Sequence, residues 1–257
     1  MAPLLSPAEH LTRLGTAADR FTEVLATADL ASAVPSCPGW DLTRLAWHLG
    51  DVHRWARRAV VEGHPGHQPD EVGPRDRDEL VAWYREAADG LVDALRSADP
   101  DSGCWTFGPK PRTASFWFCR QDHETWMHLW DAANAAAAAA GGPPTGEAAF
   151  WDPVLAADGI HEVATMFLPR QVRLDRIPPL ERVLALQPDD AVGRWLLAGD
   201  GTGPASGPDV PADACLHGPA EVLLLLLWKR ADLADPRIAV DGDPVAAHEV
   251  LASALTP

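Results

Sequence analysis

Apolar residues recur at helical spacing through the first two thirds of the chain. Between residues 11 and 25 they stand three or four positions apart, which is the period of a half-buried helix. Ser6 and Glu9 form a capping-box pattern with Pro7 at the first helical position, and Gly63 stands where a later helix can end. The pattern predicts five helices, over about 7–28, 42–62, 77–98, 113–140 and 148–167.

The pattern changes after Pro169. Short apolar runs bounded by Gly, Pro and Asp are typical of strands, and Gly218-Pro219 introduces a helix that is apolar on most sides. The predicted strands cover 182–186, 194–197, 214–217 and 237–241, and the predicted helices 219–231 and 244–255. A mixture of this kind predicts a helical domain over residues 1–168 and a small α+β domain over residues 169–257.

Composition narrows the classes of function. Hydrophobic residues make up 47% of the 257, which is enough for a core, and the net charge of −16 argues against binding to nucleic acid or to an anionic membrane. The four cysteines form no C-x-x-C pair, so neither a disulfide framework nor a cysteine-based zinc site is expected. The N-terminus lacks a signal-peptide pattern, and the longest apolar run, Val222–Trp228, is too short to span a bilayer. We expect a cytoplasmic protein, either a monomer or a homodimer.

The fourth predicted helix carries a pair of possible metal ligands. Glu124 and His128 lie four residues apart and therefore share one face, as the Glu and His ligands of metal-binding bundles do. A third ligand must come from another helix; His48 is the best donor, and Asp51 and His53 compete with it. Two histidines and one glutamate leave a fourth position, which is the catalytic pattern of zinc.

Each of these residues also has a plainer interpretation. Glu and His four apart are common on solvated helix faces, and Arg120 also fits a surface ion pair with Glu124. Asp131 either orients a ligand imidazole or is a surface carboxylate. Cys37 and Cys119 are interpreted as small core residues, not nucleophiles. Aromatic side chains near the candidate ligands indicate that these helices are buried, although such a stripe is more typical of a core than of a substrate pocket. The aromatic residues are Trp47, Trp55, Trp117, Phe118, Trp126 and Trp130.

Three blocks of sequence together resemble one known family. They are Cys37-Pro-Gly-Trp-Asp-Leu-Thr-Arg-Leu-Ala-Trp-His48-Leu, Arg120-x-x-x-Glu124-x-x-x-His128-x-x-Asp131-Ala, and Leu216 to Arg230 followed by Val240-Asp-Gly-Asp243. In this order, over most of the chain, they are similar to the mycothiol-dependent maleylpyruvate isomerase family, a branch of the DinB-like metal-binding proteins. The resemblance implies a DinB-like four-helix bundle followed by a small α+β domain, and a zinc ion held by His48, Glu124 and His128.

The resemblance also implies a cofactor, the low-molecular-weight thiol mycothiol. Zinc favours the thiolate form, which then attacks a small electrophilic substrate. Elimination after bond rotation makes the reaction an isomerisation, and retention of the adduct makes it an S-transfer. Arg120 and Trp47 are the candidate cofactor-binding residues, although Trp47 departs from the small or aliphatic residue usual in the family at that position.

Asp131 and Arg230 are the candidate catalytic residues. Arg230, near the end of an apolar helix, can reach a carboxylate of the substrate or the thiol, but it also fits an arginine whose stem covers apolar surface. Two other functions stay open at this stage. One is a metal-dependent hydrolase that activates water at the same site, and the other is a non-catalytic regulator that binds metal or a small molecule.

Overall fold

The chain forms two compact units. The computed structural model describes residues 5–66, 72–142, 150–203, 207 and 210–257. Contacts within it group Ser6–Phe150 into one unit, and Trp151–Pro257 together with Leu5 into the other. Among the residues described, no helix has both the length and the apolar composition needed to cross a membrane.

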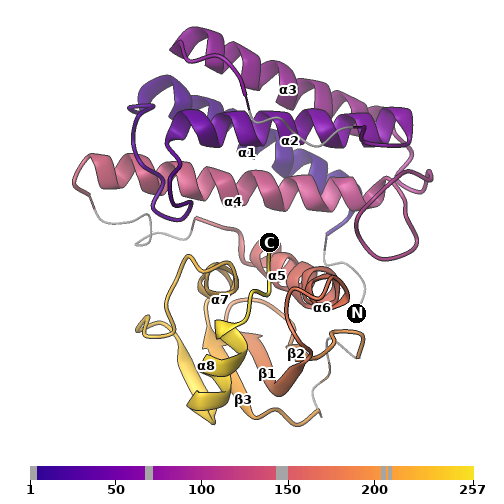
Figure 1. Ribbon diagram of the computed structural model, residues 1–257, viewed down its shortest axis with the longest axis vertical. Helices are drawn as coiled ribbons and strands as arrows, with labels where there is room; N and C mark the ends of the chain where they lie inside the picture. Colours follow the sequence, from indigo (N-terminus) through magenta and orange to yellow (C-terminus); the bar gives the residue numbers. More distant parts are fainter. Residues whose placement is uncertain (1–4, 67–71, 143–149, 204–206, 208–209) are drawn as a thin grey trace. The chain divides into compact units, whose positions relative to one another are not determined.

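The first unit is a four-helix bundle (Figure 1). Its helices are α1 (Pro7–Thr27), α2 (Leu42–Glu62), α3 (Arg77–Ser97) and α4 (Ser115–Ala139). Both α1 and α2 contact α3 and α4, so the four helices close a ring around one core. The predicted bundle is confirmed, and each helix begins and ends within two residues of its predicted bounds.

Side-chain caps mark where the first three helices of the bundle begin. The Ser6 hydroxyl accepts from the Glu9 N–H while the Glu9 carboxylate accepts from the Ser6 N–H, which is the predicted capping box. Asp41 and Asp76 accept backbone N–H bonds at the starts of α2 and α3. Gly63 ends α2 with a φ of 78°, a left-handed conformation that glycine adopts without strain.

An aromatic cluster fills one end of the bundle core. Its members are Trp55, Trp105, Phe107, Phe116 and Trp117. Trp117 is fully buried and its ring lies 5.3 Å from that of Trp55, edge to face, which is a favoured aromatic geometry. The tryptophans at 55 and 117 are therefore core residues, as the plainer interpretation of the aromatic stripe expected.

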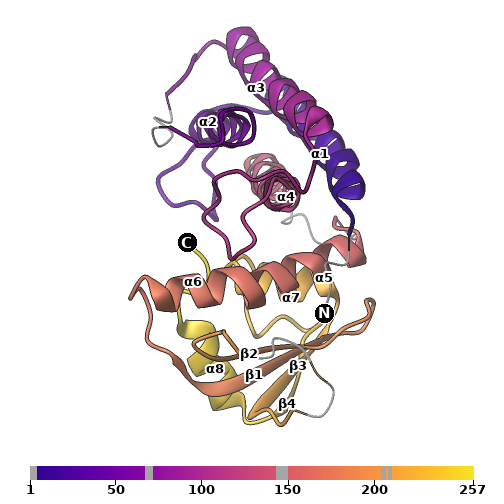
Figure 2. The same ribbon diagram turned by 90° about the vertical axis from the view of Figure 1, so that its right-hand side faces the viewer.

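The second unit is the small α+β domain that the sequence predicts (Figure 2). Its sheet has the order β2-β1-β3-β4, in which β1 and β3 are parallel and the two outer pairings are antiparallel. Both α7 and α8 pack on β1 and β3. The elements are α5 (Pro153–Glu162), a π-helical turn (Val163–Phe167), α6 (Leu168–Arg173), β1 (Leu180–Pro188), β2 (Trp195–Gly199), β3 (Ala214–Gly218), α7 (Ala220–Leu227), β4 (Ala239–Gly242) and α8 (Pro244–Ala252).

The fifth predicted helix differs most from the structure. It begins at Pro153, after the cap Asp152, and runs on through the π-helical turn to Arg173; the predicted start at 148 lies outside the described residues. Pro169 does not end the helix. It lies in the first turn of α6, where a backbone N–H has no partner within that helix, so the missing N–H of proline costs no hydrogen bond. Since α5 packs against α7, contacts assign residues 151–168 to the second unit, whereas the sequence places the boundary at 168.

Candidate metal centre

The structure brings the three predicted ligands together inside the bundle. His48 comes from α2, and Glu124 and His128 come from α4, the helix that packs beside it. The Nε2 atoms of His48 and His128 lie 3.3 and 3.4 Å from the same oxygen, Oε1 of Glu124. The two imidazole rings meet edge to face, with their centroids 5.0 Å apart.

The spacing of these atoms fits a zinc ion. Zinc bonds of about 2.0–2.2 Å in a tetrahedron place neighbouring ligand atoms roughly 3.3–3.6 Å apart. The two distances to Glu124 Oε1 fall in that range, and all three ligand atoms lie within 4.8 Å of one another. The side chains of His48, Glu124 and His128 are 19%, 18% and 12% exposed, so the group is sheltered but open to solvent.

A buried arginine holds the second oxygen of Glu124. Arg120 donates from Nη2 to Glu124 Oε2 over 2.7 Å and is itself only 2% exposed, which rules out the interpretation as a surface pair. Burial alone would raise the pKa of Glu124, but the Arg120 charge and the two imidazoles outweigh it and hold that pKa well below its usual value. The carboxylate is therefore ionised and presents Oε1 to the imidazoles.

Asp131 contacts one of the two imidazoles of the group. It is fully buried, so it is not a surface carboxylate, and its Oδ2 lies 2.9 Å from Nδ1 of His128. A proton on Nδ1 leaves the Nε2 lone pair directed at the ligand group. Burial lowers the pKa of His128, but the hydrogen bonds to Asp131 and Glu124 outweigh it and raise that pKa to about 9. Without a metal ion His128 is therefore protonated at neutral pH, and a metal ion that binds here would displace the proton from Nε2 and leave the one on Nδ1.

The two competing donors are engaged elsewhere. His53 is fully buried, with Nε2 3.0 Å from Oγ1 of Thr125, and burial lowers its pKa to about 3. Asp51 lies 3.7 Å from Nη1 of Arg54. Neither belongs to the group formed by His48, which accordingly fits best as the third ligand.

The other two predicted site residues have different surroundings. The Trp47 indole donates to the Pro74 carbonyl over 2.8 Å, and the Arg75 guanidinium lies 4.9 Å from the centre of its ring. Arg230 belongs to the second unit, where it donates to the Trp228 carbonyl. Cofactor binding by Arg120 and Trp47 and catalytic roles of Asp131 and Arg230 stay predictions.

Three residues of the turn before α2 also border the ligand group, although the sequence did not single them out as site residues. Ser36 donates to Asp131 Oδ1, and Cys37 Sγ lies 3.7 Å from Asp131 Oδ2. The Trp40 ring lies 4.9 Å from the ring of His48. Cys37 is therefore not simply a small core residue, because it is only half-buried and lies beside the ligand group. The available signal was the Cys37–Trp40 segment itself, which belongs to the first block of the family resemblance.

Comparison with known proteins identifies the family of this chain. The family model described as the mycothiol maleylpyruvate isomerase N-terminal domain matches residues 11–133, and the MDMPI C-terminal domain matches residues 154–248. The chain belongs to the mycothiol-dependent maleylpyruvate isomerase family. This membership confirms the recognition made from the three sequence blocks, and the prediction of an enzyme agrees with it.

Two crystal structures have the same fold as this chain. A crystal structure of the mycothiol-dependent maleylpyruvate isomerase is 15% identical with a TM-score of 0.57, over 94% of this chain and 96% of that one. A crystal structure of a histidine-to-alanine mutant of a mycothiol-dependent maleylpyruvate isomerase is 16% identical with a TM-score of 0.55, over the same shares. A comparison with curated proteins gave no match.

The substitution Asp131→Asn tests whether Asp131 orients His128. An amide in place of the carboxylate weakens the bond that fixes the Nδ1 proton, so we expect zinc affinity to fall about 10- to 100-fold, as for other residues that orient metal ligands. The measurement is competition for zinc with a chelator of known affinity. The matched control is Asp152→Asn, a capping carboxylate of α5 in the second unit. Unchanged affinity in Asp131→Asn would contradict the orienting role.

Proposed function

We propose that the protein is a zinc- and mycothiol-dependent isomerase or S-transferase that acts on a small electrophilic substrate. The observation that carries the proposal is the convergence of His48, Glu124 and His128 at zinc-ligand spacing. Membership of the family supports mycothiol as the thiol, and the name of the structurally similar enzyme supports maleylpyruvate as the first substrate to test.

The residues of the chain prepare the site for this chemistry. A zinc ion bound there supplies the positive charge that keeps a thiol deprotonated at neutral pH. Arg120 holds Glu124 as a carboxylate with one oxygen facing the imidazoles, and Asp131 holds the His128 proton on Nδ1. Two neutral imidazoles and one carboxylate beside a divalent ion leave a net charge of about +1, which favours an incoming thiolate. Trp40 borders the site with an apolar ring surface, its centroid 4.9 Å from that of His48.

The first test measures turnover with and without the thiol. Full-length protein loaded with zinc is given maleylpyruvate, and conversion is followed by proton NMR with mycothiol, with glutathione or with no thiol. We expect conversion with mycothiol and little without it. No conversion of maleylpyruvate, together with no adduct between mycothiol and a panel of small electrophiles, would overturn the proposal.

A second test separates thiol use from hydrolysis. Cobalt is substituted for zinc in the double variant Cys37→Ser/Cys119→Ser, which removes the two thiols that lie in groups of possible metal ligands. Added mycothiol is then expected to produce a sulfur-to-cobalt charge-transfer band in the near ultraviolet, because the thiol coordinates at the fourth position. A protein that hydrolyses the substrate with bound water, and leaves this spectrum unchanged on adding thiol, would contradict the proposal.

A further inference from the structure

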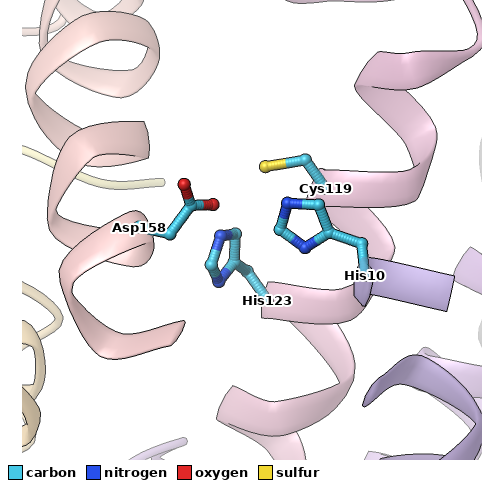
Figure 3. A group of neighbouring side chains, drawn as sticks. All are labelled: His10, Cys119, His123 and Asp158. Carbon is cyan, nitrogen blue, oxygen red and sulfur yellow. The ribbon is translucent and has the colours of Figure 1, made fainter. Parts of the chain in front are cut away.

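A second group of metal-binding side chains lies in the same bundle. His10 of α1 and Cys119 and His123 of α4 offer two imidazole nitrogens and one sulfur within 4.8 Å of one another. Figure 3 shows the two rings and the thiol turned toward one another. Asp158, also drawn in Figure 3, belongs to the second unit and is not part of the proposed ligand set.

Helix α4 carries the two groups on different faces. Cys119 and His123 are four residues apart, as Glu124 and His128 are, so each pair forms its own short row along the helix. Successive residues of a helix are turned by roughly 100° from each other, since a turn takes about 3.6 residues. His123 and Glu124 therefore face different neighbours, and α4 indeed contacts both α1 and α2. The second group is thus separate from the site of the proposed function.

The second group has its own orienting carboxylate. Nδ1 of His10 lies 2.8 Å from Oδ2 of Asp122, which is fully buried. When Nδ1–H of His10 donates a hydrogen bond to this carboxylate, Nε2 carries the lone pair and can bind a metal ion. This repeats the arrangement of Asp131 and His128 in the first site. The rings of His10 and His123 meet edge to face with centroids 5.6 Å apart, which keeps both nitrogens near one point.

We propose that His10, Cys119 and His123 form a second zinc site that links α1 to α4. Two imidazoles and a thiolate suit zinc, whereas magnesium and calcium prefer oxygen ligands. Binding replaces the Cys119 S–H bond with a zinc–sulfur bond and releases the proton to solvent. The ligand atoms now lie within 4.8 Å of one another. Small rotations of the side chains bring them to the roughly 3.3–3.6 Å that separates the ligands of a tetrahedral ion. The fourth ligand is water or another donor.

Cobalt titration of the metal-free full-length protein tests this site. The sulfur ligand gives the second site a charge-transfer band that the His48–Glu124–His128 site lacks, in buffer free of added thiol. We expect wild-type protein to take up two equivalents, one of them with the band. Cys119→Ser should take up one equivalent without the band, and Glu124→Ala one equivalent with it.

Two further variants decide the remaining cases. Cys37→Ser removes the half-buried thiol that lies beside the first ligand group and should leave the band unchanged. His123→Gln keeps the thiol but removes a nitrogen ligand, so the band should weaken or shift even if Cys119→Ser does not fold by circular dichroism. Absence of the band in wild-type protein, or its survival in Cys119→Ser, would overturn the second site and leave the first untouched.

Discussion

Replacing Glu124 with alanine is expected to empty the first metal site and abolish thiol-dependent turnover. The carboxylate contributes the one oxygen that lies near both ligand imidazoles, 3.3 Å from His48 and 3.4 Å from His128. Loss of a residue that only orients a ligand costs about 10- to 100-fold in affinity, so loss of the ligand itself should cost more than about 100-fold. Zinc content is measured in the Cys119→Ser background, where we expect it to fall from near one equivalent to a small fraction.

The controls for this experiment address folding. Glu124→Ala leaves the buried Arg120 charge without its carboxylate, which is costly in a protein interior. His128→Gln removes a ligand but leaves Arg120 paired with Glu124, and Asp131 keeps its bond from Ser36. This variant should lose zinc while the circular dichroism spectrum is kept. Glu23→Gln, an exposed carboxylate change on α1, should retain full zinc content. Zinc retained in both Glu124→Ala and His128→Gln would show that these side chains do not hold the ion.

The pairing of Glu124 with His128 was predictable because both lie on one helix, where spacing alone fixes a shared face. The sequence favours His48 over Asp51 and His53. In the structure His53 is fully buried against Thr125, and Asp51 lies beside Arg54, so neither joins the group. The metal itself and the roles of these residues stay predictions, which the zinc measurements test.

The parts of the site that sequence reasoning missed lie in irregular structure. Ser36, Cys37 and Trp40 belong to a turn, and a turn has no fixed period that tells which side chains face the bundle. Only the fold reveals that this turn lies over Asp131 and His48. The same applies to the cluster of His10, Cys119 and His123. His10 is more than one hundred residues away from its partners, and Cys119 alone fits a small core residue equally well.

The fold was predictable where local signals agree. Apolar period predicts all four helices of the bundle, side-chain caps mark the starts of the first three, and Gly63 marks the end of the second; the structure has these bounds. The fifth helix was wrong at its C-terminal end because two local signals conflict. Pro169 and the polar residues after it predict the end of the helix. In the structure a π-helical turn at 163–167 precedes α6, and the proline lies in the first turn of α6, where it is tolerated.

The substitution Trp117→Ala is expected to lower the free energy of unfolding of the bundle by about 3–5 kcal/mol, the range for large aromatic residues removed from a core. Trp117 is fully buried, donates from Nε1 to the Trp105 carbonyl over 2.9 Å and contacts Trp55 edge to face. The measurement is urea unfolding followed by circular dichroism, on protein stripped of metal so that ligand binding does not add to stability.

The conservative variant Trp117→Phe separates packing from a role in the metal site. It keeps an aromatic ring in the cluster and should lose clearly less stability than Trp117→Ala. Trp117 precedes Glu124 by about two helical turns, or roughly 10 Å along α4, so folded protein of either variant should keep its zinc affinity. A loss below about 1 kcal/mol in Trp117→Ala would be far under the core range. Such a result, together with weakened zinc binding, would instead make the aromatic cluster part of the substrate pocket.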